Sequence, residues 1–290
     1  MKIYILPIEE KFKPKSQKFR YPAHNSDFGV EQDFYIYLGK NKEIQTNNPD
    51  EADWHYLPIF WTRWHLNHNY GQEGLVELQK EVDKRIISKN KTFTICQYDD
   101  GPIVDLGNSI QFLASRKSNH GIDIPLLSKK HRQPFFKLKK IYTASFVGRI
   151  STYHLRKEMQ QYLESEKDIL IKDGNFSSRY FVKQMMKSFT SLCPRGYGGS
   201  SFRFFESMHL GVAPLLIGDI DTRPFKKFIE WDDISFYSNN MPEVIKILKT
   251  RKQTLLEMGT KSKKIFENEL DYQKWCKFVV KELEYLKNEK

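Results

Sequence analysis

The stretch 191–219 contains the residue types best suited to holding a phosphate. Its loop, residues 194–201, carries three glycines, two serines and a proline. Because glycine has no Cβ, such a loop can bring backbone N–H groups close to an anion. Ser200 or Ser201 is expected to cap the helix that follows, and the N-terminus of a helix is itself electropositive. The stretch therefore predicts an anion-binding loop between two buried strands.

Arg203 and Glu206 extend this prediction to a nucleotide diphosphate. They stand three residues apart on the expected helix and so share one of its faces. A guanidinium suits phosphate oxygens, whereas a carboxylate suits the hydroxyls of a ribose. The alternative is a glycine-rich turn between core elements, with Arg203 and Glu206 forming a surface ion pair.

Two further pairs of residues follow predicted strands. Gly148 and Arg149 end a strand at 141–147, and a glycine and an arginine at a strand-to-helix turn suit a phosphate. Asp99 and Asp100 follow a strand at 92–97, at the strand end where α/β proteins place their ligands. Either aspartate could act as a general base. The alternative for this second pair is a plain Asp-Gly turn.

An aromatic cluster in the first half suits two roles. Tyr56, Trp61 and Trp64 could form part of a core, or a surface that stacks on the ring of a sugar acceptor. The nearby His65 and His68 lack a third metal ligand and are interpreted as ordinary polar histidines.

Asp219 and Asp221 have the D-x-D spacing that binds a divalent metal in some nucleotide-sugar enzymes. They lie after a strand in a turn-rich segment, which favours a plain turn, so no metal site is predicted.

Apolar runs and turn signals predict an α/β fold in two domains, each with its own set of strands and helices. Ligand is then expected in the cleft between them. Strands are expected at 2–6, 33–38, 51–60, 92–97, 109–114, 121–126, 141–147, 168–172 and 212–217, and helices at 75–86, 153–164, 180–188, 202–210 and 242–248. The segments 9–27 and 127–140 are expected to be loops. A last helix carries an apolar face between Tyr272 and Leu286, which must dock on its own domain or on the first half.

Composition restricts the class of protein. The net charge of +11 favours nucleotides, acidic glycans or an anionic membrane surface as partners. The basic residues are dispersed apart from short clusters at 129–132 and 137–140, which speaks against a nucleic-acid-binding protein. Three cysteines without metal-ligand spacing indicate a reducing compartment. No apolar run is long enough to span a membrane, and a cytoplasmic location is expected.

The residues of the second half resemble the exostosin family of glycosyltransferases. The segments 192–196, 201–206 and 211–217, followed by Asp219, match the order and spacing of that family's central signature. Residues 224–225 and Trp231 match the continuation of that signature. Weaker matches occur in the right order at 51–58, 98–102, 123–125, and 146–148 with Arg156. The resemblance covers roughly residues 50 to 240.

This resemblance implies a GT-B fold, in which two Rossmann-like domains face each other across a cleft. It places an acceptor domain at 1–135, a nucleotide-sugar domain at 136–268 and a C-terminal helix, 269–290, that crosses back to the first domain. The family is inverting and typically uses UDP-sugars, with UDP-xylose one candidate here. GT-B enzymes generally need no bound metal, because arginines and a helix N-terminus neutralise the leaving diphosphate.

The expected mechanism assigns each candidate residue a role. Asp99 or Asp100 takes the proton from the acceptor hydroxyl as that hydroxyl attacks the sugar. Tyr98 replaces the family's usual histidine and Asp100 its usual tryptophan, so the choice between the two aspartates stays open. Tyr56, Trp61 and Trp64 are the candidate acceptor-binding residues. The candidate donor-binding residues are Arg149, Arg195, Gly196, Gly199, Ser200, Ser201, Arg203 and Glu206.

The expected partners are a UDP-sugar donor and an oligosaccharide or glycoprotein acceptor, with room for peripheral contact with a membrane. The absence of a membrane anchor or stem fits a compact viral or microbial member of the family, acting in the cytoplasm of the host cell if viral. The alternative function is a non-catalytic glycan- or nucleotide-binding protein that keeps the fold.

Overall fold

The computed structural model describes residues 1–15, 29–136 and 138–289. Contacts divide the chain into two compact units. The first unit comprises Met1–Ile124 together with Tyr272–Lys290, and the second comprises Pro125–Asp271. The sequence places the corresponding boundaries at 135 and 268.

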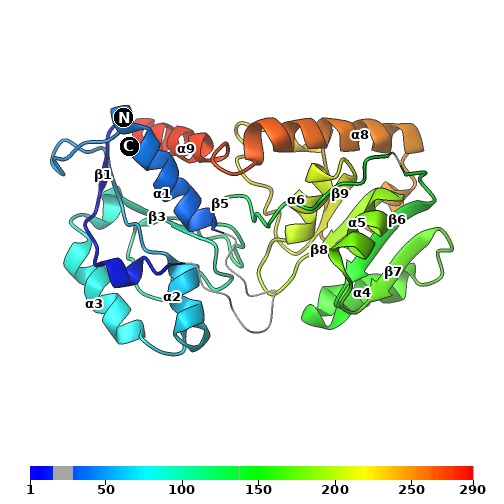
Figure 1. Cartoon of the computed structure of the whole chain (residues 1–290), viewed down its shortest axis with the longest axis horizontal. Helices are drawn as coiled ribbons and strands as arrows, with labels where there is room; N and C mark the ends of the chain where they lie inside the picture. The colour runs from blue at the N-terminus through cyan, green and yellow to red at the C-terminus, as the bar shows by residue number, and fades with distance from the viewer. Residues whose placement is uncertain (16–28, 137, 290) are drawn as a thin grey trace. The chain divides into compact units, whose positions relative to one another are not determined.

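The first unit is built on a parallel sheet of five strands in the order β1-β2-β3-β4-β5 (Figure 1). Its strands are β1 (Ile3–Ile5), β2 (Trp54–Tyr56), β3 (Thr92–Cys96), β4 (Ile110–Leu113) and β5 (Ile122–Asp123). Every residue of β3 is buried, as expected of a central strand in a parallel sheet that is covered on both faces. The four helices of this unit in the described residues are α1 (Val30–Lys40), α2 (Trp61–Asn67), α3 (Leu75–Arg85) and α9 (Cys276–Asn288).

The segment 33–38, expected to be a strand, lies instead within helix α1. Val30, Phe34 and Leu38 are spaced four residues apart and are all fully buried, as on one face of a helix. In a strand Ile36 would share the face of Phe34 and Leu38, but it is 45% exposed. The run of aromatic and β-branched side chains between Phe34 and Leu38 suggested a strand, but packing of the helical stripe decides the structure. Residues 16–28 of the predicted loop at 9–27 lie outside the described residues.

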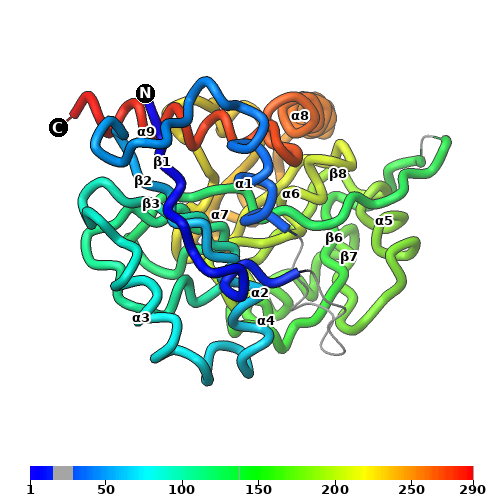
Figure 2. Tube along the Cα trace, turned by 60° about the vertical axis from the view of Figure 1, so that its left-hand side comes forward, coloured from blue at the N-terminus to red at the C-terminus, as the bar shows by residue number. Residues whose placement is uncertain are grey.

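The C-terminal helix α9 packs within the first unit, beside α1 (Figures 1 and 2). The buried carboxylate of Asp33 accepts a hydrogen bond of 2.8 Å from Nε1 of Trp275. In turn, Nε1 of Trp54 donates to the carbonyl of Leu283 at 3.1 Å. Two indole donors are thereby satisfied in the core, and they fix the end of the chain to α1 and β2.

The second unit contains another parallel sheet of five strands, in the order β10-β9-β8-β6-β7 (Figure 1). Its strands are β6 (Tyr142–Gly148), β7 (Ile169–Asp173), β8 (Ser188–Pro194), β9 (Ala213–Ile217) and β10 (Phe236–Ser238). Numbered along the unit, this order is 2-1-3-4-5, so the chain reverses its direction across the sheet between β6 and β8. Such a switch point leaves a crevice at the carboxyl ends of the two strands.

Helices cover both faces of the second sheet. Its helices are α4 (His154–Leu163), α5 (Ser178–Met186), α6 (Phe202–His209), α7 (Met241–Leu248) and α8 (Lys252–Ile265), and a π-helical turn, Phe266–Leu270, follows α8. Residues of α4 and α7 share one apolar cluster with β6, β8 and β9. Residues of α5 and of α8 join separate clusters with the segment 210–213.

Both units are thus α/β units built on a parallel sheet of five strands, and the predicted α/β fold class is confirmed. The 3.6-residue pattern at Leu75–Ile86 and the apolar runs at 92–97, 141–147 and 212–217 mark real elements. Among the described residues, no helix combines the length and the apolar character needed to cross a bilayer.

Candidate functional site

The carboxyl ends of β6 and β8 bring together the residues that the sequence singles out in the second unit. β6 ends at Gly148, and Arg149 follows it. β8 ends at Pro194, where the glycine-rich loop begins. Since these two strands flank the switch point of the sheet, the two turns lie at the place where open α/β sheets bind ligands.

Arg203 reaches from α6 to the end of β6. Its Nη2 donates to the carbonyl of Val147 at 2.7 Å, and its guanidinium lies 4.3 Å from the centre of the Phe146 ring. A Cβ at position 148 would lie only 2.5 Å from Nη2. Gly148 is therefore the residue that lets the guanidinium lie against the strand end.

Arg156 ties the two strand ends to each other. From helix α4 it donates to the carbonyls of Arg149 and Arg195, each at 2.9 Å, and to that of Pro194 at 3.4 Å. One guanidinium thus bridges the turn after β6 and the loop after β8. The fork of five donors in arginine suits this role, which lysine could not fill.

Arg156 and Arg203 are buried arginines whose guanidinium groups have no carboxylate in direct contact among the described residues, although the charge of Glu206 acts on Arg203 from a distance. Among the residues that the structure describes, neither forms an ion pair, and the buried Nε of Arg203 has no hydrogen-bond partner. Burial lowers the pKa of both guanidinium groups, and for Arg156 the neighbouring Arg203 lowers it further. A buried charge without a counter-ion is costly, so this pair favours binding of an anion.

The glycine-rich loop is held in shape by Arg195. Its side chain is 4% exposed, donates to the carbonyl of Gly198 at 3.1 Å and forms an ion pair with Asp219. The guanidinium also lies 4.3 Å from the centre of the Tyr153 ring. Arg195 therefore braces the loop in this structure. Gly196 packs against Arg156, because a Cβ there would lie 3.3 Å from its Nη2.

In the described residues, the start of α6 is not capped by a side chain. Ser201 occupies the N-cap position with extended backbone angles, but its side chain makes no capping hydrogen bond. Ser200, like Ser201, is 4% exposed. The predicted cap is thus correct in position and wrong in its hydrogen bond. The N-terminal end of α6 is electropositive because of the helix dipole, and it therefore suits an anion. Gly199 accepts a hydrogen bond of 3.3 Å from the hydroxyl of Thr222 through its carbonyl.

Glu206 is engaged on one of its two carboxylate oxygens. Its Oε1 accepts hydrogen bonds from Nε2 of His131 at 2.8 Å and from the hydroxyl of Ser128 at 3.2 Å. Within the described part of the chain, Oε2 makes no hydrogen bond. The surface ion pair between Arg203 and Glu206, which was the alternative interpretation, does not form; each side chain has other partners.

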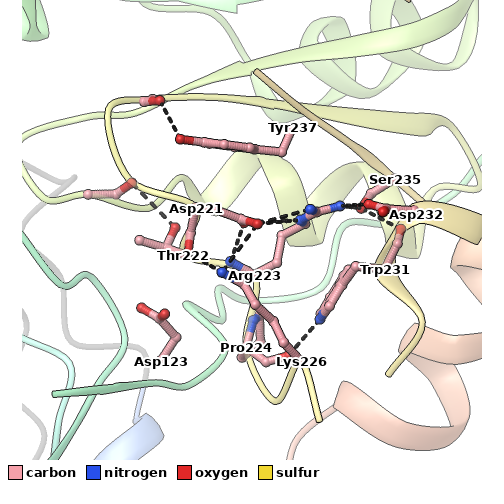
Figure 3. Close-up of polar contacts among 12 residues, drawn as sticks. Asp123, Asp221, Thr222, Arg223, Pro224, Lys226, Trp231, Asp232, Ser235 and Tyr237 are labelled. Carbon is pink, nitrogen blue, oxygen red and sulfur yellow. Dashed lines mark hydrogen bonds and ion pairs between the residues drawn. The ribbon is translucent and has the colours of Figure 1, made fainter. Parts of the chain in front are cut away.

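Figure 3 shows how the segment after β9 is fixed. The guanidinium of Arg223 donates to both carboxylate oxygens of Asp221, at 2.9 and 3.0 Å, and to Asp232 at 2.8 Å. Burial raises the pKa of Asp221, but the hydrogen bonds and charge of Arg223 outweigh it and leave that pKa below its usual range. Asp219 binds Arg195 instead, so the two carboxylates of the D-x-D segment have different arginine partners.

Asp99 and Asp100 lie in the turn directly after β3 in the first unit, as the sequence predicts. Asp100 is exposed and pairs with Lys117, which follows β4, whereas Asp99 is partly buried. Burial, with the nearby charges of Asp100 and Asp99, raises the pKa of Tyr98 to about 12, and its hydroxyl donates to the carbonyl of Tyr70 at 2.9 Å. The phenol therefore stays protonated at neutral pH, and Tyr98 does not compete with the aspartates as a base.

The aromatic cluster belongs to the core and not to the surface. Tyr56 and Trp61 are 0% exposed and Trp64 is 2% exposed. Nε1 of Trp61 donates to the hydroxyl of Thr94 at 2.8 Å. We therefore correct the acceptor-binding assignment of these three residues, because no face of their rings is accessible to a sugar. The sequence allowed both roles, and only the packing of α2 against the sheet separates them.

Three structural contacts cannot be predicted from single sequence motifs. In the sequence His131 is only one member of a basic cluster, yet it contacts Glu206. Arg156 is indicated only by the family resemblance. Glu31, 1% exposed, accepts hydrogen bonds from the backbone N–H groups of Thr62 and Gln97 at 3.1 and 2.9 Å, and so ties the start of α2 to the end of β3. Each depends on contacts between residues far apart in the chain, which no local pattern indicates.

The chain is similar in sequence to an exostosin-1 homolog and to proteins named as probable glycosyltransferases. No family model matches the chain. The exostosin-1 homolog of Caenorhabditis elegans is 20% identical, over 92% of this chain and 80% of its own length. A probable beta-1,4-xylosyltransferase of Arabidopsis thaliana is 22% identical, over 88% of this chain and 74% of its own. A probable glucuronosyltransferase of Oryza sativa subsp. japonica is 28% identical, over 39% of this chain and 27% of its own.

These relatives support the resemblance to exostosin-like proteins and the predicted glycosyltransferase class. Among solved structures, TarM has a TM-score of 0.39 at 9% identity, covering 74% of this chain and 57% of TarM. The glycosyltransferase VinC in complex with dTDP has a TM-score of 0.38 at 8% identity, covering 90% of this chain and 80% of VinC. At these TM-scores the two structures are too distant to carry an argument about this chain.

Proposed function

We propose that the chain is an inverting glycosyltransferase that moves a sugar from a UDP-sugar to a hydroxyl group of a glycan acceptor. The observation that carries the proposal is the pair of buried arginines, Arg156 and Arg203, at the switch point of the second sheet without a carboxylate partner. A diphosphate would supply the missing negative charge. The similarity to named glycosyltransferases over most of the chain supports the same class.

In this proposal each group around the switch point has a task. The diphosphate lies against the loop 195–201, Arg149 and Arg203, and its leaving charge is stabilised by the electropositive N-terminal end of α6. Oε2 of Glu206 accepts a hydrogen bond from a ribose hydroxyl, while His131 and Ser128 hold Oε1. Arg156 and Arg195 hold the loop 195–201 and the turn after β6 in position without direct contact with the ligand.

The first experiment tests the nucleotide. UDP is expected to raise the Tm more than GDP, CDP or dTDP at equal concentration, because a ligand that binds only the folded state stabilises it by mass action. Glu206→Gln is expected to weaken UDP binding about tenfold or more, since an amide replaces a charged acceptor. Glu158→Gln, an exposed change on α4, is the matched control and should leave the affinity unchanged. Equal shifts with all four nucleotides would contradict a uridine-specific site.

The second experiment tests the general base. Replacing the acting aspartate, through Asp99→Asn or Asp100→Asn, is expected to lower kcat roughly 10²–10⁴-fold while UDP affinity stays the same. Asp50→Asn, another exposed turn carboxylate of the first unit, is the control. Undiminished transfer by the double variant would remove both aspartates from the mechanism. Hydrolysis and transfer below detection for every donor, with UDP still bound, would favour a non-catalytic binding protein.

A further inference from the structure

Residues 128–136 and 138–141, which we call the strap, form an exposed basic and aromatic surface on the second unit. Hydrogen bonds attach the strap to both ends of helix α5. Nδ1 of His131 forms a hydrogen bond of 2.8 Å with the hydroxyl of Ser178, the first residue of α5. The backbone N–H of Ile141 donates at 2.8 Å to the carbonyl of Lys187, just after α5. Figures 1 and 2 both show the strap beside α5. It is therefore a defined part of the unit's surface.

Two adjacent phenylalanines of the strap are almost bare. Phe135 is 93% exposed and Phe136 is 69% exposed, the highest and third-highest values among the large apolar side chains exposed in the described residues. A phenyl ring has no polar atom that could form a hydrogen bond with water. Transfer of both rings from water to an apolar environment would therefore lower the free energy. Single exposed apolar residues are ordinary, but two neighbours on one protruding segment indicate a contact surface.

The charges around these rings are of one sign. Lys129, Arg132 and Lys139 are exposed on the strap, and the guanidinium of Arg132 lies 5.7 Å from the centre of the Phe135 ring. The segments 128–141 and 178–187 contain no aspartate or glutamate. Three carboxylates of the described residues lie near the strap: Asp271 pairs with Lys130, Glu206 pairs with His131, and Glu257 of α8 lines a pocket with Leu138 and Lys140. None of these three described carboxylates forms an ion pair with Lys129, Arg132 or Lys139. The cations beside the phenylalanines are thus left for an outside partner.

We propose that the strap is a docking surface for an anionic phospholipid membrane, with Phe135 and Phe136 inserting at the headgroup level and Lys129, Arg132 and Lys139 contacting lipid phosphates and carboxylates. Rings beside cations are the pattern of interfacial membrane contacts, in which an apolar part enters the acyl boundary and basic residues bind anionic headgroups. A soluble polyanion would satisfy the cations but would leave the two phenyl rings in water, so the lipid surface fits both features. Binding of this kind is reversible and weakens with salt.

The test is sedimentation of the full chain with vesicles. Binding is expected to vesicles of phosphatidylcholine mixed with phosphatidylserine, at least about tenfold stronger than to pure phosphatidylcholine, and to decrease at high salt. Phe135→Ser/Phe136→Ser is expected to lower the partition coefficient about tenfold or more, and Lys129→Gln/Arg132→Gln/Lys139→Gln to abolish the preference for phosphatidylserine. Control variants with matched changes on exposed positions of the first unit, Val76→Ser/Ile87→Ser and Lys42→Gln/Lys80→Gln/Lys91→Gln, should bind as the parent chain does.

Several outcomes would overturn the proposal. These are no binding to the mixed vesicles, equal binding to both vesicle types, and equal loss in the control variants. A fourth is tighter binding to soluble heparin than to vesicles, unaffected by Phe135→Ser/Phe136→Ser, because it would assign the basic residues to a soluble polyanion. Far-UV circular dichroism of each variant checks that the fold persists, since both phenylalanines and all three cations are exposed and their replacement should not change it. UDP binding by Phe135→Ser/Phe136→Ser is expected to be unchanged.

Discussion

At the scale of single residues, the candidate nucleotide site depends on glycine as much as on arginine. Gly148 has a φ of +156°, and its missing side chain leaves the space that the Arg203 guanidinium fills. The guanidinium contacts the Phe146 ring and the Val147 carbonyl, which fixes a flexible side chain in one position. A preorganised cation binds a phosphate without the cost of ordering it at the moment of binding.

Gly148→Ala tests this dependence. The new Cβ would lie 2.5 Å from Nη2 of Arg203, at the mobile end of a long side chain, so the guanidinium is expected to move and to lose its bond to Val147. We expect UDP affinity to fall about tenfold, with a loss of unfolding free energy of about 1 kcal/mol from the backbone angle. Isothermal calorimetry and urea unfolding measure the two effects.

Gly39→Ala is the matched control for this variant. Gly39 lies in α1, and a Cβ added there would have no atom within 4 Å, so alanine should raise stability slightly and leave UDP binding unchanged. Unchanged UDP affinity in Gly148→Ala would show that the position of Arg203 does not control binding.

At the scale of elements, the turns after β3 and α2 are joined by a buried histidine. His65 is 0% exposed, and its Nε2 lies 3.0 Å from the carbonyl of Pro102, to which it donates. Its Nδ1 is buried and has no hydrogen-bond partner among the residues that the structure describes. The pKa of His65 is lowered to about 4, mainly by burial. The Pro102 carbonyl and Asp100 raise this pKa, but burial outweighs them, and His68 lowers it further. The turn that carries Asp99 and Asp100 is therefore held by a hydrogen bond from a neutral imidazole.

This arrangement predicts a loss of stability in mild acid. Between pH about 6.5 and about 4 the unfolded chain binds a proton at His65 and the native chain does not, so stability falls as the pH falls through this window. The shift corresponds to up to about 3 kcal/mol. Urea unfolding at a series of pH values measures it.

His65→Gln keeps an amide donor for the Pro102 carbonyl and removes the titration, so its unfolding free energy should vary less between pH about 6.5 and about 5. The exposed His120→Gln serves as the control and should keep the full dependence of the parent chain. The same slope in His65→Gln as in the parent would assign the effect to other groups.

At the scale of the whole molecule, the first unit is completed by the last residues of the chain. Trp275, Val279 and Leu283 of the C-terminal segment are 0% exposed, and they pack in a unit whose other residues precede position 125. Burial of a large apolar side chain contributes roughly 1.5–3 kcal/mol, and a whole domain is stable by only about 5–15 kcal/mol. The C-terminal segment therefore decides whether the first unit folds.

A chain that ends at Asp271 tests this conclusion. Its first unit is expected to lose hydrogen-exchange protection in β1, β2 and β3, while the strands of the second unit keep theirs, because the second unit retains every residue of its core. Exchange measured by mass spectrometry separates the two units. A chain that ends at Asn288, just after α9, is the control. Full protection of β1–β3 in the shorter chain would show that the first unit is stable without α9.

The sequence determined much of the second unit by itself. Most of its strands and helices follow from apolar runs and turn residues, although α8 and β10 are not among the predicted elements. The positions of Gly148, Arg203 and Glu206 follow from motif spacing, since each depends mainly on neighbours within a few residues. The segment 33–38 shows where local reasoning fails. Aromatic and β-branched residues favour a strand by propensity, but Val30, Phe34 and Leu38 bury one helical stripe, and tertiary packing outweighs propensity.

Only the tertiary structure decided which candidate residues are available to a ligand. Trp61 and Trp64 have the composition of a sugar platform and are core residues, whereas Phe135 and Phe136 look like an ordinary apolar pair and are exposed. The partners of Glu206 and of Arg156 likewise come from segments distant in the chain. A sequence specifies residue types and local periods, but exposure and the pairing of buried charges are properties of the packed chain, because they depend on which distant segments fill the space around a side chain.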